Sequence, residues 1–347
     1  MSGKRQHILP RFLQKGFASR IQDEKSFTHV YRKGGKHFET TLENVGLENY
    51  FYGKPGETSA DEEITKIEGA YAQLTTALRN EPDGTRVADL PVADFVAHLT
   101  IRTKQLREFF RESAEYLLDE ITAYLSTPEH MRRLLLSKPE LMRSELTKSL
   151  EGIAVPEAYK DFLIQFVEEN AQEIVNLYMS DVQDAMETLT AQMRSILPKA
   201  VKDGHIKTLA EHPASEPRAE EYRSLNWFIR DTSEPLVLGD IGCLFETQEA
   251  RRYKPLNDKG DKLVNIYLPL SSCKLLLGTA YSAHPLVDVG QINKATAKCS
   301  YEYFISADAG TNNDGLMASI GEWAGILTSE EREQLLKEIF EDLDLGL

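Results

Sequence analysis

A long run of helix-forming residues lies between two β-rich stretches, and this order constrains the fold more than any other feature of the sequence. Residues from about 128 to 200 are almost all helix formers, whereas the first 55 residues and those after 220 are rich in strand formers and turns. Strands at both ends with helices between them predict one α+β fold. We expect a mixed or antiparallel sheet built from the first and last quarters of the chain, with a long helical middle section.

Four parts follow from this pattern. Residues 1–125 are predicted to form the N-terminal part of the α+β core, and residues 126–203 a helical insertion or arm. Residues 204–220 are polar and broken by prolines, so we expect a linker there. Residues 221–347 would supply the β-rich C-terminal part of the same core, with a closing helix.

The N-terminal part combines a hairpin with two helices. Residues 26–31 and 36–41 flank Gly34-Gly35, and a Gly-Gly pair between β-rich runs predicts a hairpin. A helix over 61–80 carries apolar residues at spacings of three and four. A longer helix opens at Asp89 and Pro91, and its apolar stripe consists of Val92, Phe95, Val96, Leu99, Leu106, Phe109, Phe110 and Leu117.

The residues after Pro156 keep a near-helical apolar period for about forty residues. This length favours either a protruding helical hairpin or dimerisation arm, or an ordinary helical layer packed on the core. Beyond residue 220, the sequence predicts a closing helix over 329–342 and strands over 225–229, 235–238, 263–268, 274–277 and 301–305.

Net charge excludes one class of function. The chain carries a formal charge of −15, with 40 Lys and Arg against 55 Asp and Glu. Binding to nucleic acid or to an anionic membrane through counterion release needs many clustered cations. A protein that coats nucleic acid or a membrane surface along its whole length is therefore excluded.

The cysteines and the apolar runs predict a compartment. Cys243, Cys273 and Cys299 lie in apolar or strand-like contexts without Cys-x-x-Cys spacing, so we expect reduced, buried thiols. No apolar run approaches the roughly 18 residues that span a bilayer, and the first residues lack the apolar core of a signal peptide. We expect a cytoplasmic protein with no membrane partner.

Several standard catalytic motifs are missing from the sequence. It has no Gly-x-x-x-x-Gly-Lys-Ser/Thr loop, no Gly-x-Gly-x-x-Gly after a strand, no Gly-x-Ser-x-Gly elbow and no His-Glu-x-x-His pair. Residues 308–315 are rich in Asp, Asn and Gly, but their acids miss the EF-hand positions, so we expect a loop. There is no motif for a nucleotide cofactor.

The opening block, Gln6 to Phe17, resembles the His-x-x-Pro…Leu-x-x-Phe start of a bacterial family of domains of unknown function, number 4238. Further segments resemble the family in the same order: residues 44–52, 63–68, Arg102-Thr103 with Arg107, Asn226-Trp227, 235–240 and 268–271. One segment departs from the family, which usually reads Ser-Asp-Asn-Pro where this chain reads Gly239-Asp240-Ile241-Gly242. The resemblance implies no established activity, and it points only to a role in phage defence or as a toxin-like effector.

Charged residues at the edges of two apolar stripes form the first candidate site. On a helical wheel, Glu68 lies at the edge of the 61–80 stripe, and Arg102 and Arg107 lie on opposite flanks of the next helix. Charged residues at such borders extend to water or are paired. One interpretation is a structural bridge between the helices, from Glu68 to Arg102 or to Arg107.

The other interpretation is a catalytic pocket formed by four residues: His7, Glu68, Arg102 and Asp240. Glu68 and Asp240 would supply carboxylate oxygens to a divalent metal, Mg²⁺ or Mn²⁺. His7 would act as a base or ligand near neutral pH, although a hydrogen-bonding role is the alternative. The guanidinium of Arg102 or Arg107 would pair with a phosphate.

Basic residues crowd the first twenty positions of this acidic chain: Lys4, Arg5, Arg11, Lys15 and Arg20. We expect Arg5, Arg11, Lys15 and Arg107 to bind substrate, guiding a nucleic-acid strand or a nucleotide to the site. A solvated N-terminal face is the alternative.

Two functions from different classes fit these observations. The first is a metal-assisted hydrolase acting on nucleic acid or nucleotide phosphates. The second is a non-enzymatic interaction or sensor protein, in which residues 128–200 bind a protein partner or a second copy of the chain. In the second, the polar residues are buried structural bridges.

Overall fold

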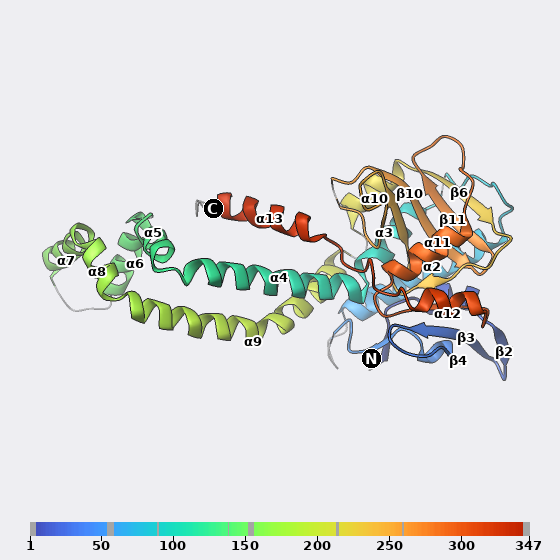
Figure 1. Cartoon of the computed structure of the whole chain (residues 1–347), viewed down its shortest axis with the longest axis horizontal. Coiled ribbons are helices and arrows are strands. Elements are labelled where there is room, and N and C mark those ends of the chain that lie inside the picture. The colour runs from blue at the N-terminus through green and yellow to red at the C-terminus, as the bar shows by residue number, and fades with distance from the viewer. Residues whose placement is uncertain are drawn as a thin grey trace. The chain divides into compact units, whose positions relative to one another are not determined.

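The computed structural model describes residues 5–53, 59–88, 90–137, 139–151, 156–212, 215–258 and 260–342 (Figure 1). The chain divides into two compact units. Unit 1 comprises Met1–Phe110 and Val201–Ile326, and unit 2 comprises Arg111–Ala200 and Leu327–Leu347. The division places most of the expected helical arm, 126–203, in unit 2.

Unit 1 contains every strand that the described residues form, and neighbouring strands run antiparallel. The strands are β1 (Arg5–His7), β2 (Arg20–Gln22), β3 (Lys25–Arg32), β4 (Phe38–Thr41), β5 (Leu47–Asn49), β6 (Asn226–Asp231), β7 (Leu238–Gly239), β8 (Leu244–Thr247), β9 (Tyr253–Lys254), β10 (Leu263–Ser271), β11 (Lys274–Thr279) and β12 (Tyr303–Ser306). The structure confirms the α+β class, with a helical middle between the N-terminal and C-terminal strands.

One sheet combines the two ends of the chain, as the sequence predicts. Its order is β2-β3-β12-β7, and β4 also pairs with β3. The hairpin is confirmed, because Val30 of β3 pairs with Phe38 of β4 across a turn in which Gly34 has a positive φ of 66°. Thr28 Oγ1 donates to the carbonyl of Ser306, 278 positions away.

The second large sheet comes wholly from the C-terminal part, in the order β6-β11-β10-β8-β9. Its central strand, β10, is an almost continuous apolar run because side chains on both of its faces are buried. Helix α11 (Val289–Cys299) packs on β8 and β9 of this sheet and on β7 and β12 of the other. The sequence does not predict α11, β8 or β9.

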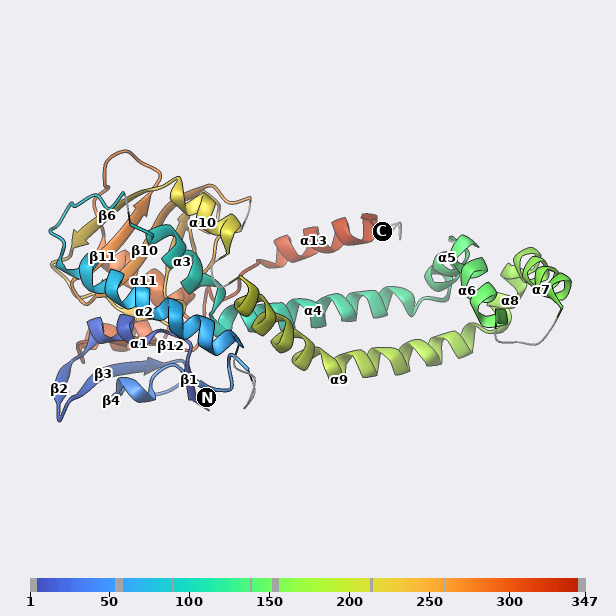
Figure 2. The same ribbon diagram turned by 180° about the vertical axis from the view of Figure 1, so that it is seen from behind.

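Unit 1 contains five further α-helices among its described residues, of which α2 and α3 follow the expected apolar stripes. They are α1 (Arg11–Gln14), α2 (Ser59–Asn80), α3 (Val92–Ile101), α10 (Glu216–Arg223) and α12 (Thr311–Met317). Helix α2 lies beside α3, with the ring centroids of Tyr71 and Phe95 4.9 Å apart (Figure 2). The core also buries Cys243 and Cys299, whereas Cys273 is exposed, contrary to the expectation.

The single long helix expected after residue 91 is wrong, because the structure has two helices there. Helix α3 ends at Ile101, and α4 (Lys104–Leu125) begins after Thr103. The Thr103 hydroxyl accepts a hydrogen bond from the Leu106 amide at 3.2 Å, which caps the new helix. The break places Arg102 in the interior between the two helices. Asp89, which we expected at the start of this helix, lies outside the described residues.

Unit 2 contains only helices and the short connections between them among its described residues. Besides parts of α4 and α9 (Met179–Glu211), it contains α5 (Pro128–Ser137), α6 (Pro139–Glu151), α7 (Glu157–Glu169), α8 (Ala171–Leu177) and α13 (Ser329–Asp342). Helices α4 and α9 run side by side there, and Thr122 Oγ1 lies 3.2 Å from Thr190 Oγ1 (Figure 1). A small core consists of Tyr124, Leu125, Met131 and Phe340.

Three other expectations need correction. The long apolar period after Pro156 is broken at Asn170 and Tyr178 into α7, α8 and α9. The stretch 204–220 is not a simple linker, because it holds the end of α9 and the start of α10. Residues 308–315 are not all loop, since α12 begins at Thr311. The closing helix α13 has its predicted bounds, but it belongs to unit 2 because Phe340 packs on Tyr124.

Candidate functional site

The break between α3 and α4 creates a buried polar cluster around Arg102. Only 1% of this side chain is exposed, and its Nη1 lies 2.6 Å from Glu68 Oε1 of α2. Nη1 also donates to His98 Nε2 at 3.0 Å, and Nη2 donates to the His7 carbonyl at 2.9 Å. The bridge between Glu68 and Arg102, one of the two interpretations from the sequence, is therefore present.

Tyr52 closes one side of this cluster. Its ring centroid lies 5.3 Å from Cζ of Arg102, and its hydroxyl donates to the His7 carbonyl at 3.1 Å. Burial raises the pKa of Tyr52 to about 12. Burial alone would lower the pKa of Arg102, but Tyr52 and Glu68 beside it raise that pKa above its ordinary value. The guanidinium is therefore permanently charged and held by its neighbours.

Arg107 forms a second buried cluster and does not bridge to Glu68. Its Nε donates to His205 Nδ1 at 3.0 Å and its Nη2 to the Phe51 carbonyl at 2.8 Å. Its Cζ lies 3.6 Å from the Phe51 ring centroid, and its Nη1 lies 3.6 Å from Glu48 Oε1. A phosphate would have to displace these partners, so the expected substrate-binding role of Arg107 gains no support.

His205 takes part in this cluster as a neutral imidazole. Its Nε2 donates to the Ile101 carbonyl at 2.7 Å, since Nδ1 accepts from Arg107. Burial, together with the Arg107 charge, lowers the pKa of His205 to about 4. The sequence gives no signal for this role, because His205 lies in the stretch expected as a linker.

We expect His205 to make the protein less stable as the pH falls from about 6.5 to about 4. In that range the unfolded chain binds a proton at this imidazole that the folded chain excludes, so protonation favours unfolding. Urea unfolding at about pH 7 and about pH 4.5 should show a loss about 2 kcal/mol smaller in His205→Gln than in the natural chain. Since every other titrating group is common to both proteins, equal losses would contradict a buried neutral His205.

His7 enters the cluster through its main chain. Strand β1 pairs with β5, which fixes the His7 carbonyl beside Arg102. The His7 Nε2 atom is buried and makes no hydrogen bond with any described residue. Burial and the nearby charge of Arg11 lower the pKa of the imidazole to about 4. This pKa lies well below that of a proton shuttle near neutral pH.

Asp240 is held by backbone amides and not by the Arg102 cluster. Its Oδ1 accepts from the Tyr301 amide at 2.8 Å, and its Oδ2 accepts from the amides of Glu302 and Tyr303 at 2.6 and 3.1 Å. Burial raises the pKa of Asp240 to about 6, although these amides act in the opposite direction. The carboxylate fixes the turn that leads into β12.

The structure therefore brings together three of the four expected catalytic residues, Glu68, Arg102 and the main chain of His7. No hydrogen bond or ion pair between described residues joins Asp240 to Glu68. Among those residues, no three His, Cys, Asp or Glu side chains form a group that could hold a metal ion. The expected Mg²⁺ or Mn²⁺ ligand pair, Glu68 and Asp240, thus gains no support from the geometry.

Neighbouring side chains neutralise part of the basic N-terminal face. Arg11 forms an ion pair with Glu43 at 2.6 Å, and Arg5 donates to Asn44 Oδ1 at 3.0 Å. Arg20 is paired with Glu39 at 2.9 Å, while Lys15 is exposed. Lys4 lies outside the described residues. These pairs support the solvated face more than a nucleic-acid track.

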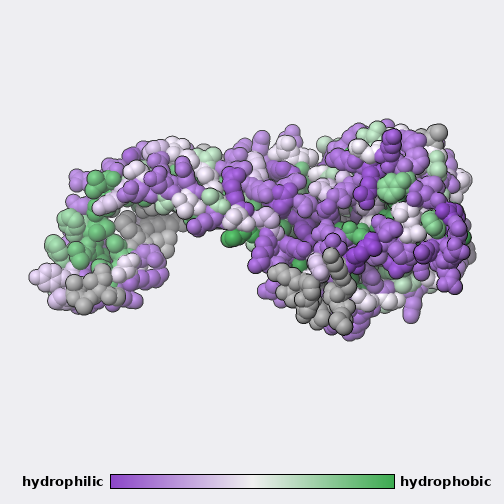
Figure 3. Space-filling model, turned by 90° about the horizontal axis from the view of Figure 1, so that it is seen from below, coloured by the Kyte–Doolittle hydropathy of each residue, from purple (hydrophilic) through white to green (hydrophobic). Residues whose placement is uncertain are grey.

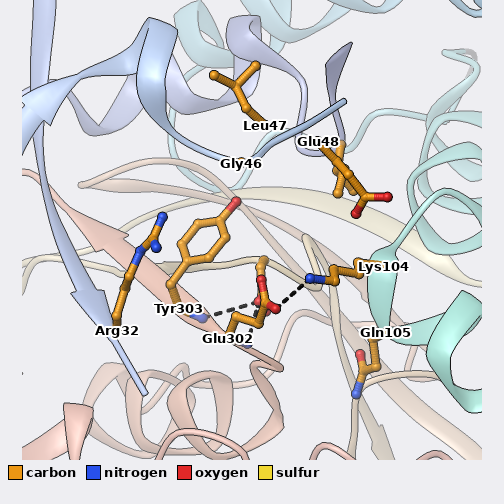
Figure 4. Close-up of a pocket in the computed structure, with 10 residues that line it drawn as sticks. Arg32, Gly46, Leu47, Glu48, Lys104, Gln105, Glu302 and Tyr303 are labelled. Atoms are coloured by element: carbon orange, nitrogen blue, oxygen red, sulfur yellow. Dashed lines mark hydrogen bonds and ion pairs between the residues drawn. The ribbon is translucent and has the colours of Figure 1, made fainter. Parts of the chain in front are cut away.

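A small pocket lies beside the start of β12, and Asp240 is one of its lining residues. It has a volume of about 60 Å³, and its lining includes Arg32, Gly46, Glu48, Lys104, Glu302 and Tyr303. Arg32 and Lys104 lie on opposite sides of Tyr303, and the Tyr303 hydroxyl points toward Gly46 (Figure 4). Lys104 Nζ forms an ion pair with Glu302 Oε1 at 2.6 Å. Of the lining residues, only Asp240 was expected at a site from the sequence.

Comparison with known proteins gives one match. The family model described as "Protein of unknown function (DUF4238)" matches residues 5–310. No curated protein and no solved structure matches the chain. Among the described helices, none combines the length and the apolar composition that a bilayer span requires. Segments that carry the resemblance, from the opening block to Arg107, meet in the two buried arginine clusters. The chain belongs to the DUF4238 family of proteins of unknown function.

Proposed function

We propose that this protein is a non-enzymatic interaction protein and that its helical unit binds a partner through α7. The observation that carries this proposal is an apolar stripe that points outward. Between 40% and 65% of each side chain in the stripe is exposed, and the stripe consists of Tyr159, Phe162, Leu163 and Phe166.

The positions of these residues define one face of α7. The spacings of three and four place all four side chains along one line of the helix, while Ile164 points to the opposite side and is buried. The rings of Phe162 and Phe166 stack with centroids 6.4 Å apart. Figure 3 shows hydrophobic surface gathered at the end of unit 2 that α5 to α8 form. A contiguous exposed apolar face is typical of a protein-interaction surface.

Charge beside the stripe selects the partner. Glu169 lies at one edge of the apolar face and is exposed, whereas Asp161 lies near the side of Ile164. The basic residue of the helix, Lys160, is already paired with Glu157 at 3.3 Å. A Lys or Arg beside the apolar face of a partner would pair with Glu169, whereas a second copy of α7 offers this edge only another acid. The partner is therefore an amphipathic helix whose apolar face is flanked by Lys or Arg.

Metal-assisted hydrolysis, the other function expected from the sequence, has weaker support. Glu68 is engaged by a buried arginine, and both oxygens of Asp240 accept backbone hydrogen bonds. A metal ion would have to compete with these partners. Hydrolysis of nucleic acid or nucleotides, and a role in phage defence, remain predictions from the sequence and from the resemblance.

A peptide-binding experiment tests the interaction proposal. The probe is a fluorescein-labelled amphipathic helix of Leu and Lys, about 18 residues or five turns long. Fluorescence anisotropy should give a micromolar Kd with the full chain. The double variant Phe162→Ser/Phe166→Ser should weaken binding at least about tenfold, because two aromatic side chains lose their buried contacts. Ile21→Ser, which removes an exposed apolar side chain of unit 1, is the matched control.

The variants distinguish specific docking from simple charge attraction. Phe162→Ser/Phe166→Ser keeps every acidic residue, so unchanged binding would show that the peptide only senses the negative charge of the chain. A peptide with Glu in place of Lys should not bind. Sedimentation equilibrium of the chain alone should show a monomer, and a dimer abolished by the same double variant would overturn the proposed partner in favour of a second copy.

A further inference from the structure

The pocket beside β12 contains hydrogen-bond donors without acceptors. The Tyr303 side chain is 6% exposed, yet its hydroxyl makes no hydrogen bond with any described residue. Arg32 lies at the end of β3, and its guanidinium forms no ion pair with a described residue. The hydroxyl oxygen is not itself sealed from solvent, so it can donate to a molecule in the pocket. Both groups can therefore donate to an acceptor from outside the chain.

The acids that line the pocket do not supply this acceptor. Glu302 is paired with Lys104, and Asp240 is saturated by three backbone amides. Glu48 lies 3.6 Å from the guanidinium of Arg107. Each of these acids thus has partners within the protein, whereas Arg32 forms no ion pair with a described residue and its Cζ lies 5.8 Å from the Phe38 ring centroid.

The Tyr303 hydroxyl fits beside Gly46 because this residue has no side chain. Gly46 has a φ of 64°, and a Cβ at this position would collide with the Tyr303 hydroxyl. The space that remains, about 60 Å³, suits a few waters or one group of four or five heavy atoms. Arg32, Lys104 and Glu302 are partly or fully exposed, so the pocket is accessible from solvent.

We propose that this pocket binds the oxyanion group of a small ligand, a carboxylate or a phosphate, between Arg32 and the Tyr303 hydroxyl. The planar guanidinium offers two parallel N–H donors, which suit the oxygens of either group. The hydroxyl provides a third donor from the pocket wall. Lys104 is paired with Glu302 on the other side of the Tyr303 ring, and this ion pair bounds the site (Figure 4).

Fluorine NMR of the full chain tests the proposal. With 3-fluorotyrosine placed at position 303, acetate and inorganic phosphate are titrated in turn at constant ionic strength. We expect a saturable shift with at least one of them, with a Kd of about 1–10 mM, as befits so small a probe. The stronger of the two identifies the source of the oxyanion. Acetamide, the neutral counterpart of acetate, should give no saturable shift.

Two variants complete the test. Arg32→Gln should weaken binding at least about tenfold, and Arg32→Lys should restore part of it, because the charge returns without the planar geometry. Arg32 is exposed, so both variants should fold. A label at Tyr281, which is 52% exposed, reports non-specific effects of the salts. No saturable shift with either anion, equal binding by acetamide, or full binding by Arg32→Gln would each overturn the proposal.

Discussion

Replacing Glu68 by alanine is expected to lower the free energy of unfolding of unit 1 by about 3 kcal/mol. The substitution leaves the Arg102 guanidinium, which is 1% exposed, without the carboxylate 2.6 Å away. Breaking a buried ion pair costs about 3–5 kcal/mol, and the lower end applies because 28% of the Glu68 side chain reaches water. Glu68→Gln, which keeps the acceptor oxygen, should lose less.

Tryptophan fluorescence during urea unfolding measures this effect in unit 1. The chain has two tryptophans, Trp227 and Trp323, and both lie in that unit. Glu63→Ala on the same helix is the matched control, because Glu63 is exposed, and it should change the stability by less than about 0.5 kcal/mol. If Glu68→Ala were as stable as the control, the bridge would have no structural role, and the catalytic interpretation of Glu68 would gain support.

The second large effect is expected at a buried ion pair far from the arginine clusters. Lys254 Nζ lies 2.7 Å from Asp261 Oδ1, and the two side chains are only 2% and 6% exposed. Lys254→Met should lower the free energy of unfolding by about 3–5 kcal/mol, because it leaves the Asp261 carboxylate charged and unpaired in the interior. Lys262→Met, which removes an exposed charge, is the control.

A double variant distinguishes the loss of the Lys254–Asp261 ion pair from the cost of leaving the Asp261 carboxylate buried without its partner. In Lys254→Met/Asp261→Asn no charge remains, and the asparagine oxygen can still accept from the Asp258 amide that Asp261 Oδ2 binds at 2.7 Å. We expect the double variant to recover at least half of the lost stability. A double variant that is less stable than Lys254→Met would show that packing of the lysine stem, and not charge, dominates at this site.

Local signals account for the elements that the sequence predicts correctly. The stripe of α2, the Gly-Gly hairpin and the bounds of α13 all depend on residues within a few positions of one another. The break between α3 and α4 has no such signal, since Leu99 and Leu106 continue the apolar register through it. Thr103 caps α4 after the break, and Arg102 is held by partners from distant parts of the chain that the local sequence does not reveal.

The contacts of the candidate site are likewise predictable from the sequence only where they depend on local pattern. The bridge between Glu68 and Arg102 is predictable, because both lie at the edge of an apolar stripe where charges must be paired or reach water. The partners of Arg107 are not predictable, because His205 is 98 positions away and no periodicity relates the two. The partners of Asp240 are not predictable for a similar reason, since they are main-chain amides that any residue supplies.

The sheet that joins the two ends of the chain also sets the order of events during synthesis. Thr28 of β3 and its partner Ser306 are 278 residues apart, which the ribosome makes in roughly 15–55 s at about 5–20 residues per second. Helices α5 to α8 rest on local contacts and form within microseconds of their emergence. The nascent chain therefore carries finished helices while β3 still exposes an open edge, and that edge stays unpaired on this side until β12 emerges.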